Sequence, residues 1–322
     1  HTGSNYSSSG YYGTKDYQKG VGELAMDALI SQYIDPYYLR ILMLIGINII
    51  LALGLNLITG VTGQLSMGHA GFMSIGAYTS AILSMQMGSP FFLSLLAGAM
   101  VAAFFGFLIG IPTLRLEGDY LAMVTIGFAE IIRVFFLNFE PGGKAVGLSG
   151  IPQNTTFVLV WTLVIIIIIL NAKLLNSRIG RAFYAIRENE IAAEASGINS
   201  TRLKVLAFTA GSFLAGLGGG LYAHYMYFIR PQDFAFMKSI ELLNMVVLGG
   251  MGSIPGTILG SVILTLLPEM LRIVAEYRLM FYGALLVILM IFRPNGLLGD
   301  VRVYDIKKQL QGQKVGLWQS SN

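Results

Sequence analysis

The segment "LNLITGVTGQLSMGHAGFMSIGAY", residues 55–78, decides how the fold of this chain is read. It places five glycines, several hydroxyl side chains, Gln64 and His69 inside a sequence that is otherwise strongly apolar. Glycine weakens a helix, and polar side chains are costly at membrane depth. A bilayer protein tolerates such a segment only where its backbone faces protein or a water-filled cavity.

The overall composition indicates an integral membrane protein. Of the 322 residues, 55% are hydrophobic and only 12% are charged, whereas soluble domains carry about 25% charged residues. Cysteine is absent and the three histidines are scattered, so disulfides and thiolate chemistry are excluded and we expect no metal site. A net charge of +4 is typical of basic cytoplasmic loops, and we expect lipid rather than nucleic acid as the surrounding partner.

The predicted fold is an all-α, polytopic transmembrane bundle of about 8–10 spans, because the apolar runs approach the ~20 residues that cross about 30 Å of hydrocarbon. The predicted spans are 38–58, 64–86, 91–111, 119–138, 156–174, 205–228, 240–257, 258–275 and 279–293. Three regions follow from this pattern: a polar, unstructured tail at 1–37, a transmembrane domain at 38–295 with a polar loop at 176–204, and a C-terminal tail at 296–322.

Basic residues set the expected orientation. Lys and Arg gather between 173 and 204 and again beyond Arg293, whereas the loop 139–155 holds only Lys144. Because cytoplasmic loops are enriched in Lys and Arg, we expect 173–204 and the C-terminal tail to lie in the cytoplasm. Five predicted spans precede the long loop, so we expect the N-terminus outside, unless 64–86 enters the membrane and returns to the same side.

A second glycine-rich segment, "NMVVLGGMGSIPGTILGSV" at 244–262, is the counterpart of the first. Pro255 denies it a continuous helix, since proline lacks an N–H donor. Paired, interrupted hydrophobic segments in the two halves of a transporter indicate a translocation path built from broken helices. The residues predicted to border that path are Asn56, Gly63, Gln64, Ser66, Gly68, His69, Gly71, Glu130, Gly249, Gly250, Gly252 and Ser253.

Each of these predictions has a structural alternative. The glycines alone are as consistent with helix packing as with a path, and the polar side chains of the first segment favour the path. For His69 a structural hydrogen bond is favoured over a proton relay. Glu130 and Arg133, the only strongly charged pair well inside a predicted span, have the i, i+3 spacing of a helical ion pair, which is favoured over a role in the path.

Small residues recur at four-residue spacing in several spans, which places them on one face of each helix and predicts close helix–helix packing. The three series are Gly98, Ala102, Gly106 and Gly110; Gly211, Ala215 and Gly219; and Gly252, Gly256 and Gly260.

The loop at 177–208 contains one predicted helix at 181–196, which Gly197 ends. Asn199, Ser200 and Thr201 are expected to cap the next span. The helix presents charged residues around small alanines, and such a surface suits either an interfacial connector or a helix that docks into another protein.

"ENEIAAEASGIN", 188–199, resembles the EAA-type loop of ABC transporter permeases, the helix that docks into the ATPase subunit. Four further stretches carry the same resemblance: the first glycine-rich segment, the second glycine-rich segment, "LRLEGDYLAMVTIGFAEIIR" and "FRPNGLLG". With them, residues 38–300 resemble the branched-chain amino acid ABC permease family, the LivM type more than LivH. The resemblance places Glu190, Ala192, Ala193 and Gly197 on the coupling motif of a cytoplasmic helix. The same predicted helix also presents the charged residues Arg187, Glu188 and Glu194, which complete the expected coupling loop.

The resemblance further implies a non-enzymatic permease of a bacterial inner membrane that imports branched-chain amino acids. Its implied partners are ABC ATPase subunits, a LivH-like sister permease or a second copy of this chain, and an extracytoplasmic substrate-binding protein. The sequence contains no G-x-x-x-x-G-K-[ST] motif, so no cofactor is expected on this chain and the partner would bind ATP. A permease for urea or short amides and an ion-coupled secondary transporter are the alternatives.

Overall fold

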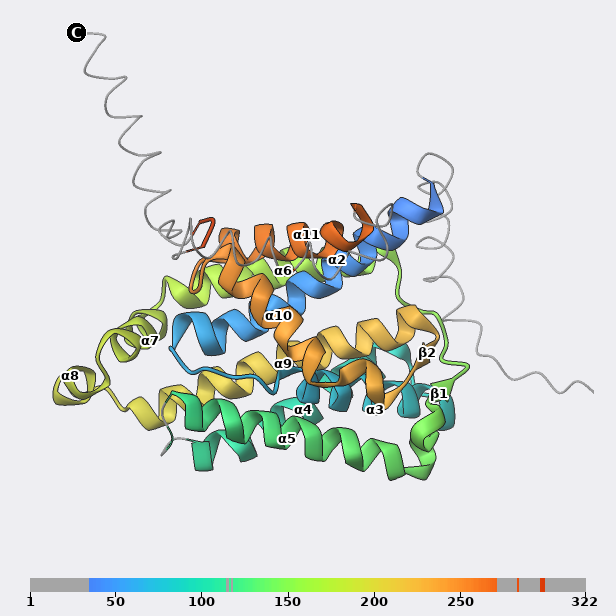
Figure 1. The fold of residues 1–322 in the computed structure, drawn as a ribbon, viewed down its shortest axis with the longest axis horizontal. Helices are drawn as coiled ribbons and strands as arrows, with labels where there is room; N and C mark the ends of the chain where they lie inside the picture. Colours follow the sequence, from blue (N-terminus) through green and yellow to red (C-terminus); the bar gives the residue numbers. More distant parts are fainter. Residues whose placement is uncertain (1–34, 114–115, 117, 271–282, 284–295, 299–322) are drawn as a thin grey trace, which may run out of the picture.

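The computed structural model describes residues 35–113, 116, 118–270, 283 and 296–298. These residues form an all-α bundle whose long helices run side by side (Figure 1). The order is α2 (Pro36–Leu55), the π-helix η1 (Asn56–Val61), α3 (His69–Gln86), α4 (Phe91–Thr113), α5 (Asp119–Asn138), α6 (Phe157–Leu175), α7 (Arg178–Glu188), α8 (Glu190–Ala195), α9 (Ser200–Met226), α10 (Phe236–Gly249) and α11 (Ile254–Met270). The all-α prediction is confirmed.

Among the described residues, five helices are long and apolar enough to cross a membrane. They are Tyr37–Val61, Phe91–Pro112, Asp119–Asn138, Phe157–Leu175 and Ser200–Met226. The shorter helix Ile254–Met270 is also apolar. Apart from Gly283, the predicted span 279–293 lies outside the described residues, as do most of the tails at 1–37 and 296–322.

Short elements join the helices at the end of the bundle opposite α7 and α8 (Figure 1). They are the 3₁₀ turns η2 (Glu140–Gly142), η3 (Lys144–Val146) and η4 (Pro231–Phe234) and the strands β1 (Leu148–Ser149) and β2 (Phe228–Ile229). The strands form one antiparallel pair in which Leu148 lies opposite Ile229. This pair ties the loop that follows α5 to the loop that follows α9.

The central helix is α9, which packs against α2, α3 and α4. Small residues allow this close contact. A Cβ atom at Gly76 of α3 would overlap the backbone of Gly216 in α9, and a Cβ at Gly98 of α4 would lie 2.6 Å from the carbonyl oxygen of Gly76. In the predicted stripe of α9, a Cβ at Gly211 would lie 2.6 Å from the Gly54 carbonyl oxygen and one at Gly219 would lie 2.0 Å from that of Met73. The stripes of α4 and α9 therefore make the predicted helix–helix contacts, whereas Gly252 of the third series lies between α10 and α11, outside both helices.

Several predicted helix boundaries are wrong, and two of these errors fall at the glycine-rich segments. The helix predicted from residue 64 begins at His69, because 62–68 has a non-helical backbone in which Gly63 has φ +73°. The division predicted between 257 and 258 lies instead at 250–253, where Gly250 and Gly252 have φ +113° and +86°. Pro255 lies in the first turn of α11, where a missing N–H donor costs no hydrogen bond, so it begins this helix rather than interrupts one.

The predicted single helix at 181–196 is also wrong, because it is two helices. Asn189 is extended (φ −160°, ψ +108°) and separates α7 from α8. Its side chain accepts a hydrogen bond from the Ala192 N–H at 3.0 Å, which caps α8. Gly197, with φ +81°, ends α8 as predicted, and the Asn199 side chain caps α9 by accepting from the Arg202 N–H at 2.9 Å.

The contact between α3 and α9 gives a testable prediction about stability. Gly76→Ala adds one methyl group where no space exists, and overpacking of this kind costs about 3 kcal/mol. We expect a clearly lower midpoint of thermal unfolding for this variant of the purified chain in detergent. The matched control is Gly127→Ala on α5, where a Cβ meets no atom within 4 Å. Equal midpoints for the two variants would contradict the packing described here.

Candidate functional site

The two glycine-rich segments meet in the structure. The Asn56 Oδ1 atom, at the first residue of η1, accepts a hydrogen bond from the Gly252 N–H at 2.8 Å. Asn56 is buried, and Gly252 belongs to the break between α10 and α11. We call this contact, together with Gly60, Met251 and the α7 residues that bind there, the junction.

Glycine is required at the junction because the backbones approach closely. A Cβ at Gly60 would overlap both the Asn56 side chain and the Gly252 amide nitrogen. Beyond the break, a Cβ at Gly260 of α11 would lie 2.9 Å from the Gly249 nitrogen of α10. The predicted residues Gly249 and Gly252 therefore have a packing role, whatever else they do.

Ser253 organises the start of α11. Its Oγ atom accepts a hydrogen bond from the Gly256 N–H at 3.2 Å, and its carbonyl oxygen accepts from the Thr257 hydroxyl at 2.8 Å. The Ser253 N–H donates in turn to the Gly250 carbonyl at 3.2 Å. The break is thus a defined turn whose backbone groups are hydrogen-bonded.

Helix α7 binds both glycine-rich segments at once. The Arg187 Nη1 donates to the Gly60 carbonyl at 2.5 Å and to the Met251 carbonyl at 3.3 Å. One turn earlier on α7, the Tyr184 hydroxyl donates to the Gly252 carbonyl at 3.0 Å. A displacement of α7 therefore acts directly on η1 and on the break.

Helix α8 presents a mixed surface beside α7. Glu190 forms an ion pair with Lys204 of α9, and the Glu194 carboxylate accepts from the Ser200 hydroxyl. Ala193 is buried, whereas Ala192 is exposed and the Ile191 side chain is 82% exposed. Two anchors thus hold α8 against the start of α9 and leave the Ile191 side chain exposed.

A cavity of about 330 Å³ lies between the first glycine-rich segment and these two helices. Its lining residues are Thr62, Gly63, Gln64, Leu116, Gly118, Leu121, Ile186, Arg187, Glu188, Asn189, Glu190, Ile191 and Lys204. The cavity therefore joins the predicted path residues Gly63 and Gln64 to the predicted coupling residues Arg187, Glu188 and Glu190.

The non-helical segment 62–68 is held to its neighbours by its backbone. The Met67 N–H donates to the Thr125 hydroxyl of α5 at 3.0 Å, and Gly68 lies so close to the Thr125 carbonyl that a Cβ would overlap it. Gln64 and Ser66 are buried, and among the described residues neither the Gln64 Nε2 nor the Ser66 Oγ has a hydrogen-bond partner. These two polar groups are available to a third group that enters.

His69 has the structural hydrogen bond that was predicted for it. Its Nε2 lies 3.0 Å from the Leu51 carbonyl oxygen, and because a carbonyl only accepts, Nε2 carries the proton. Two residues on, a Cβ at Gly71 would lie 2.9 Å from the Ala129 Cα of α5. The start of α3 is thereby packed tightly between α2 and α5.

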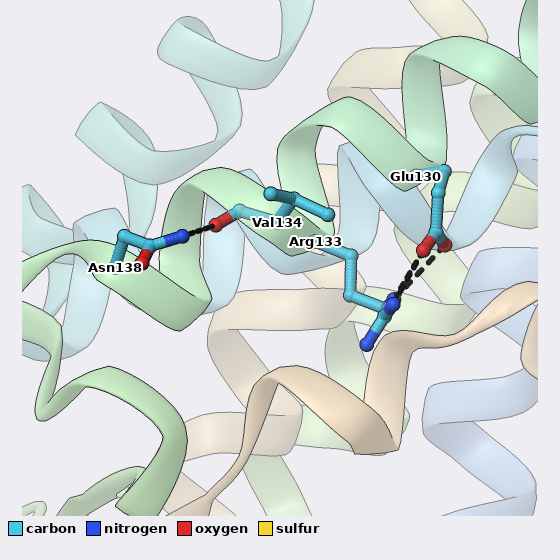
Figure 2. A network of polar contacts seen from close by, with 4 residues as sticks. All are labelled: Glu130, Arg133, Val134 and Asn138. Atoms are coloured by element: carbon cyan, nitrogen blue, oxygen red, sulfur yellow. Dashed lines mark hydrogen bonds and ion pairs between the residues drawn. The ribbon is translucent and has the colours of Figure 1, made fainter.

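Glu130 does not lie at the junction. It forms the predicted i, i+3 ion pair with Arg133 on the outer side of α5 (Figure 2), where Arg133 Nε donates to the two carboxylate oxygens at 3.0 and 2.9 Å. The sequence reading missed a second such pair, Lys238–Glu241 at 3.0 Å on α10. The span had been predicted to begin at 240, whereas α10 begins at Phe236 and includes both residues.

The structure therefore brings part of the predicted set together. Asn56, Gly63, Gly252 and Arg187 meet at or beside the junction. Sequence reasoning missed Tyr184, Ile191 and Lys204. For Tyr184 a signal existed, since it lies three residues before Arg187 and thus on the same face of a helix.

Comparisons with known proteins agree with this architecture. The family model described as "Branched-chain amino acid transport system / permease component" matches residues 37–290. The chain is 39% identical over 264 residues to a Salmonella typhimurium protein named high-affinity branched-chain amino acid transport system permease protein LivM, and 38% identical to its Escherichia coli K12 namesake. It is 33% identical over 132 residues to the E. coli permease protein LivH, which covers 40% of this chain and 42% of LivH.

Both LivM matches cover 71% of this chain and 62% of the relative, so the matched part spans less than two thirds of these proteins. No solved structure matches the chain. The family model nevertheless covers most of the sequence, and it includes the junction and helices α7 and α8. This multi-pass membrane protein belongs to the permease component family of branched-chain amino acid transport systems.

Proposed function

We propose that this chain is the membrane-spanning permease subunit of an ABC importer in a bacterial inner membrane, which translocates branched-chain amino acids. The observation that carries the proposal is the direct bonding of α7 to both helix breaks through Arg187 and Tyr184. The names of the relatives support the substrate class and do not favour urea or short amides.

The proposed energy source is a separate ATPase subunit. Helix α8 is its docking element, because Ile191 and Ala192 are exposed beside the exposed carboxylate residues Glu188 and Glu194. An apolar side chain ringed by charge is the composition of a protein–protein contact with a small buried centre. This chain itself needs no cofactor, and an extracytoplasmic binding protein delivers the substrate.

Coupling follows from the hydrogen bonds already described. Closure of the ATPases displaces α8 and, through the short connection at Asn189, α7. Arg187 and Tyr184 transmit this displacement to Gly60, Met251 and Gly252. A π-helix and a glycine turn are the weakest parts of their helices, so they absorb the movement and change access to the path.

Reconstitution tests the proposal as a whole. Proteoliposomes that contain this chain, its sister permease, the ATPase and a leucine-loaded binding protein are expected to accumulate leucine only when ATP is supplied. Vesicles with this chain alone are the control and are expected to accumulate none. Accumulation by the chain alone along an ion gradient, or transport of urea in place of leucine, would refute the proposal.

Docking of the ATPase predicts the effect of Ile191→Glu. A new carboxylate at the centre of the contact is desolvated without a partner, so we expect at least tenfold less ATPase to co-purify, equivalent to about 1.4 kcal/mol. Val146→Glu is the control, because Val146 is 78% exposed at the opposite end of the bundle. It is expected to leave co-purification unchanged. Equal ATPase recovery with both variants would show that α8 is not the docking element.

The junction predicts a separate effect for Arg187→Ala. Loss of a hydrogen bond from a charged donor costs about 1.5–3 kcal/mol, so we expect at least tenfold less leucine transported per ATP hydrolysed, while the ATPase still co-purifies. Arg181→Ala is the matched control on α7, since the Arg181 Nη1 bonds only to Asn176 of its own loop at 3.4 Å. Normal coupling in Arg187→Ala would exclude this side chain from transmission.

A further inference from the structure

The cavity beside the first glycine-rich segment is closed on one side and open on the other. Four of its lining residues are buried, and we call them its floor: Thr62, Gln64, Leu121 and Ile186. Residues at and between α7 and α8 are exposed, and we call them its mouth: Glu188, Asn189 and Ile191. Its volume of about 330 Å³ lies within the range of small-molecule sites, about 300–1,000 Å³. A small solute therefore fits, and it enters beside α8.

The floor contains a polar group without a partner. Gln64 is only 6% exposed, and among the described residues its Nε2 makes no hydrogen bond. Most buried side-chain polar groups are hydrogen-bonded, so this donor calls for an explanation. Lys204 belongs to the same lining; an ammonium group has three N–H donors, and within the described part of the chain one of them bonds to Glu190. Gln64 and Lys204 can thus donate together to a carboxylate that enters the cavity.

The charges of the lining balance. Arg187 and Lys204 are basic, whereas Glu188 and Glu190 are acidic. A solute with a net charge of either sign meets two like charges in this cavity, and their repulsion opposes its binding. A zwitterion has both signs and no net charge, so each of its ends finds an opposite charge. The lining therefore selects a zwitterion over an anion or a cation.

The rest of the lining includes branched apolar side chains. Leu116, Leu121 and Ile186 line the cavity, and the last two are buried. Contact with such side chains removes the apolar surface of a ligand from water, whereas a polar ligand side chain would lose its hydrogen bonds there. Two charged ends and a branched apolar side chain are the chemistry of leucine, isoleucine and valine.

We propose that this cavity is a regulatory site for the imported amino acid, which binds here after its release into the cytoplasm and slows further import. The proposal rests on the proposed function, which supplies both the imported solute and the cytoplasmic position of α7 and α8. The ligand carboxylate accepts hydrogen bonds from Gln64 and Lys204, and its ammonium group donates to Glu188. Its apolar side chain packs against Leu121 and Ile186.

The walls of the cavity belong to parts that the proposed coupling moves relative to each other. Gln64 lies in segment 62–68, which the Met67 N–H ties to Thr125 of α5 at 3.0 Å. Glu188 is the last residue of α7, the helix that the ATPase displaces under the proposed function. An amino acid bonded to Gln64 at one end and to Glu188 at the other holds these walls together. Because a ligand stabilises the state that it binds, it opposes the displacement of α7.

Photolabelling locates the site without any need for transport. The purified chain in detergent is incubated with a diazirine analogue of leucine, irradiated and digested, and the adducts are mapped by mass spectrometry. We expect adducts at Leu121 or Ile186 that an excess of leucine suppresses and an excess of glutamate or urea does not. Adducts only elsewhere in the chain, or equal suppression by glutamate, would overturn the site.

Gln64→Leu tests the unpaired amide. The substitution replaces a buried donor that has no partner in this chain by an apolar side chain, a change that a folded interior tolerates. Loss of a hydrogen bond to a carboxylate weakens binding about tenfold, so we expect half-maximal labelling at about tenfold more probe. Gln86→Leu, at the far end of α3, is the matched control, since its Nε2 bonds to the Pro141 carbonyl at 3.4 Å. Equal labelling of both variants would remove Gln64 from the site.

Transport kinetics test the regulatory role. Proteoliposomes contain the whole transporter, with ATP inside and labelled leucine on its binding protein outside, and are preloaded with unlabelled leucine. At about ten times its dissociation constant, internal leucine is expected to lower the initial rate of uptake about tenfold, whereas internal glutamate leaves it unchanged. The readout is the ratio of rates with and without internal leucine, so a change in basal rate does not affect it. For Gln64→Leu we expect a much smaller reduction.

The outcomes separate this site from the proposed function. ATP-dependent uptake that internal leucine does not slow would remove the regulatory site alone. Absence of uptake by vesicles that contain no internal leucine would remove the proposed function, and the photolabelling would still decide whether the cavity binds the amino acid.

Discussion

The structure depends on one constraint: a buried backbone polar group cannot bond to water, so a break in a buried helix must be closed by the protein itself. At the break between α10 and α11, the Gly252 N–H bonds to the Asn56 side chain and its carbonyl to the Tyr184 hydroxyl. At η1, the Gly60 carbonyl bonds to Arg187. The side chains that close the breaks, those of Asn56, Tyr184 and Arg187, also join the two breaks to each other. Tyr184 and Arg187 belong to α7.

The rest of the bundle is built for rigidity. Helix α9 contacts three neighbours through positions where glycine or alanine removes the side chain, so that Gly76 and Gly216 meet backbone to backbone. Close packing of this type leaves little room for rearrangement. The π-helix and the glycine turn lie at the same end of the bundle as α7 and α8. The irregular backbone is thus gathered at that end, apart from the close contacts that α9 makes with α3 and α4.

The sequence predicted the fold class, the small-residue contacts, the ion pair of Glu130 and the caps at Gly197 and Asn199, because each depends on local spacing or on local backbone conformation. The sequence predicted one helix at 181–196, because Ala, Glu, Arg and Ile favour helix throughout this segment. In the structure, the Asn189 side chain caps a second helix by accepting a hydrogen bond from the Ala192 N–H, so the segment is divided in two. The sequence placed the interruption at Pro255, whereas the turn is made by Gly250 and Gly252. The contacts of Arg187 and Tyr184 could not be predicted, because 127 residues separate Arg187 from Gly60 and only the tertiary fold joins them.

The shared attachment at Arg187 has a kinetic consequence. One guanidinium nitrogen holds carbonyl groups from two distant parts of the chain, so neither can leave its position without disturbing the other. If η1 and the break between α10 and α11 could move independently, four combinations of their positions would be accessible. Linking them through a single cation reduces the accessible combinations to those in which they change together. Under the proposed function, this shared attachment would make η1 and the break respond as one unit to any displacement of α7.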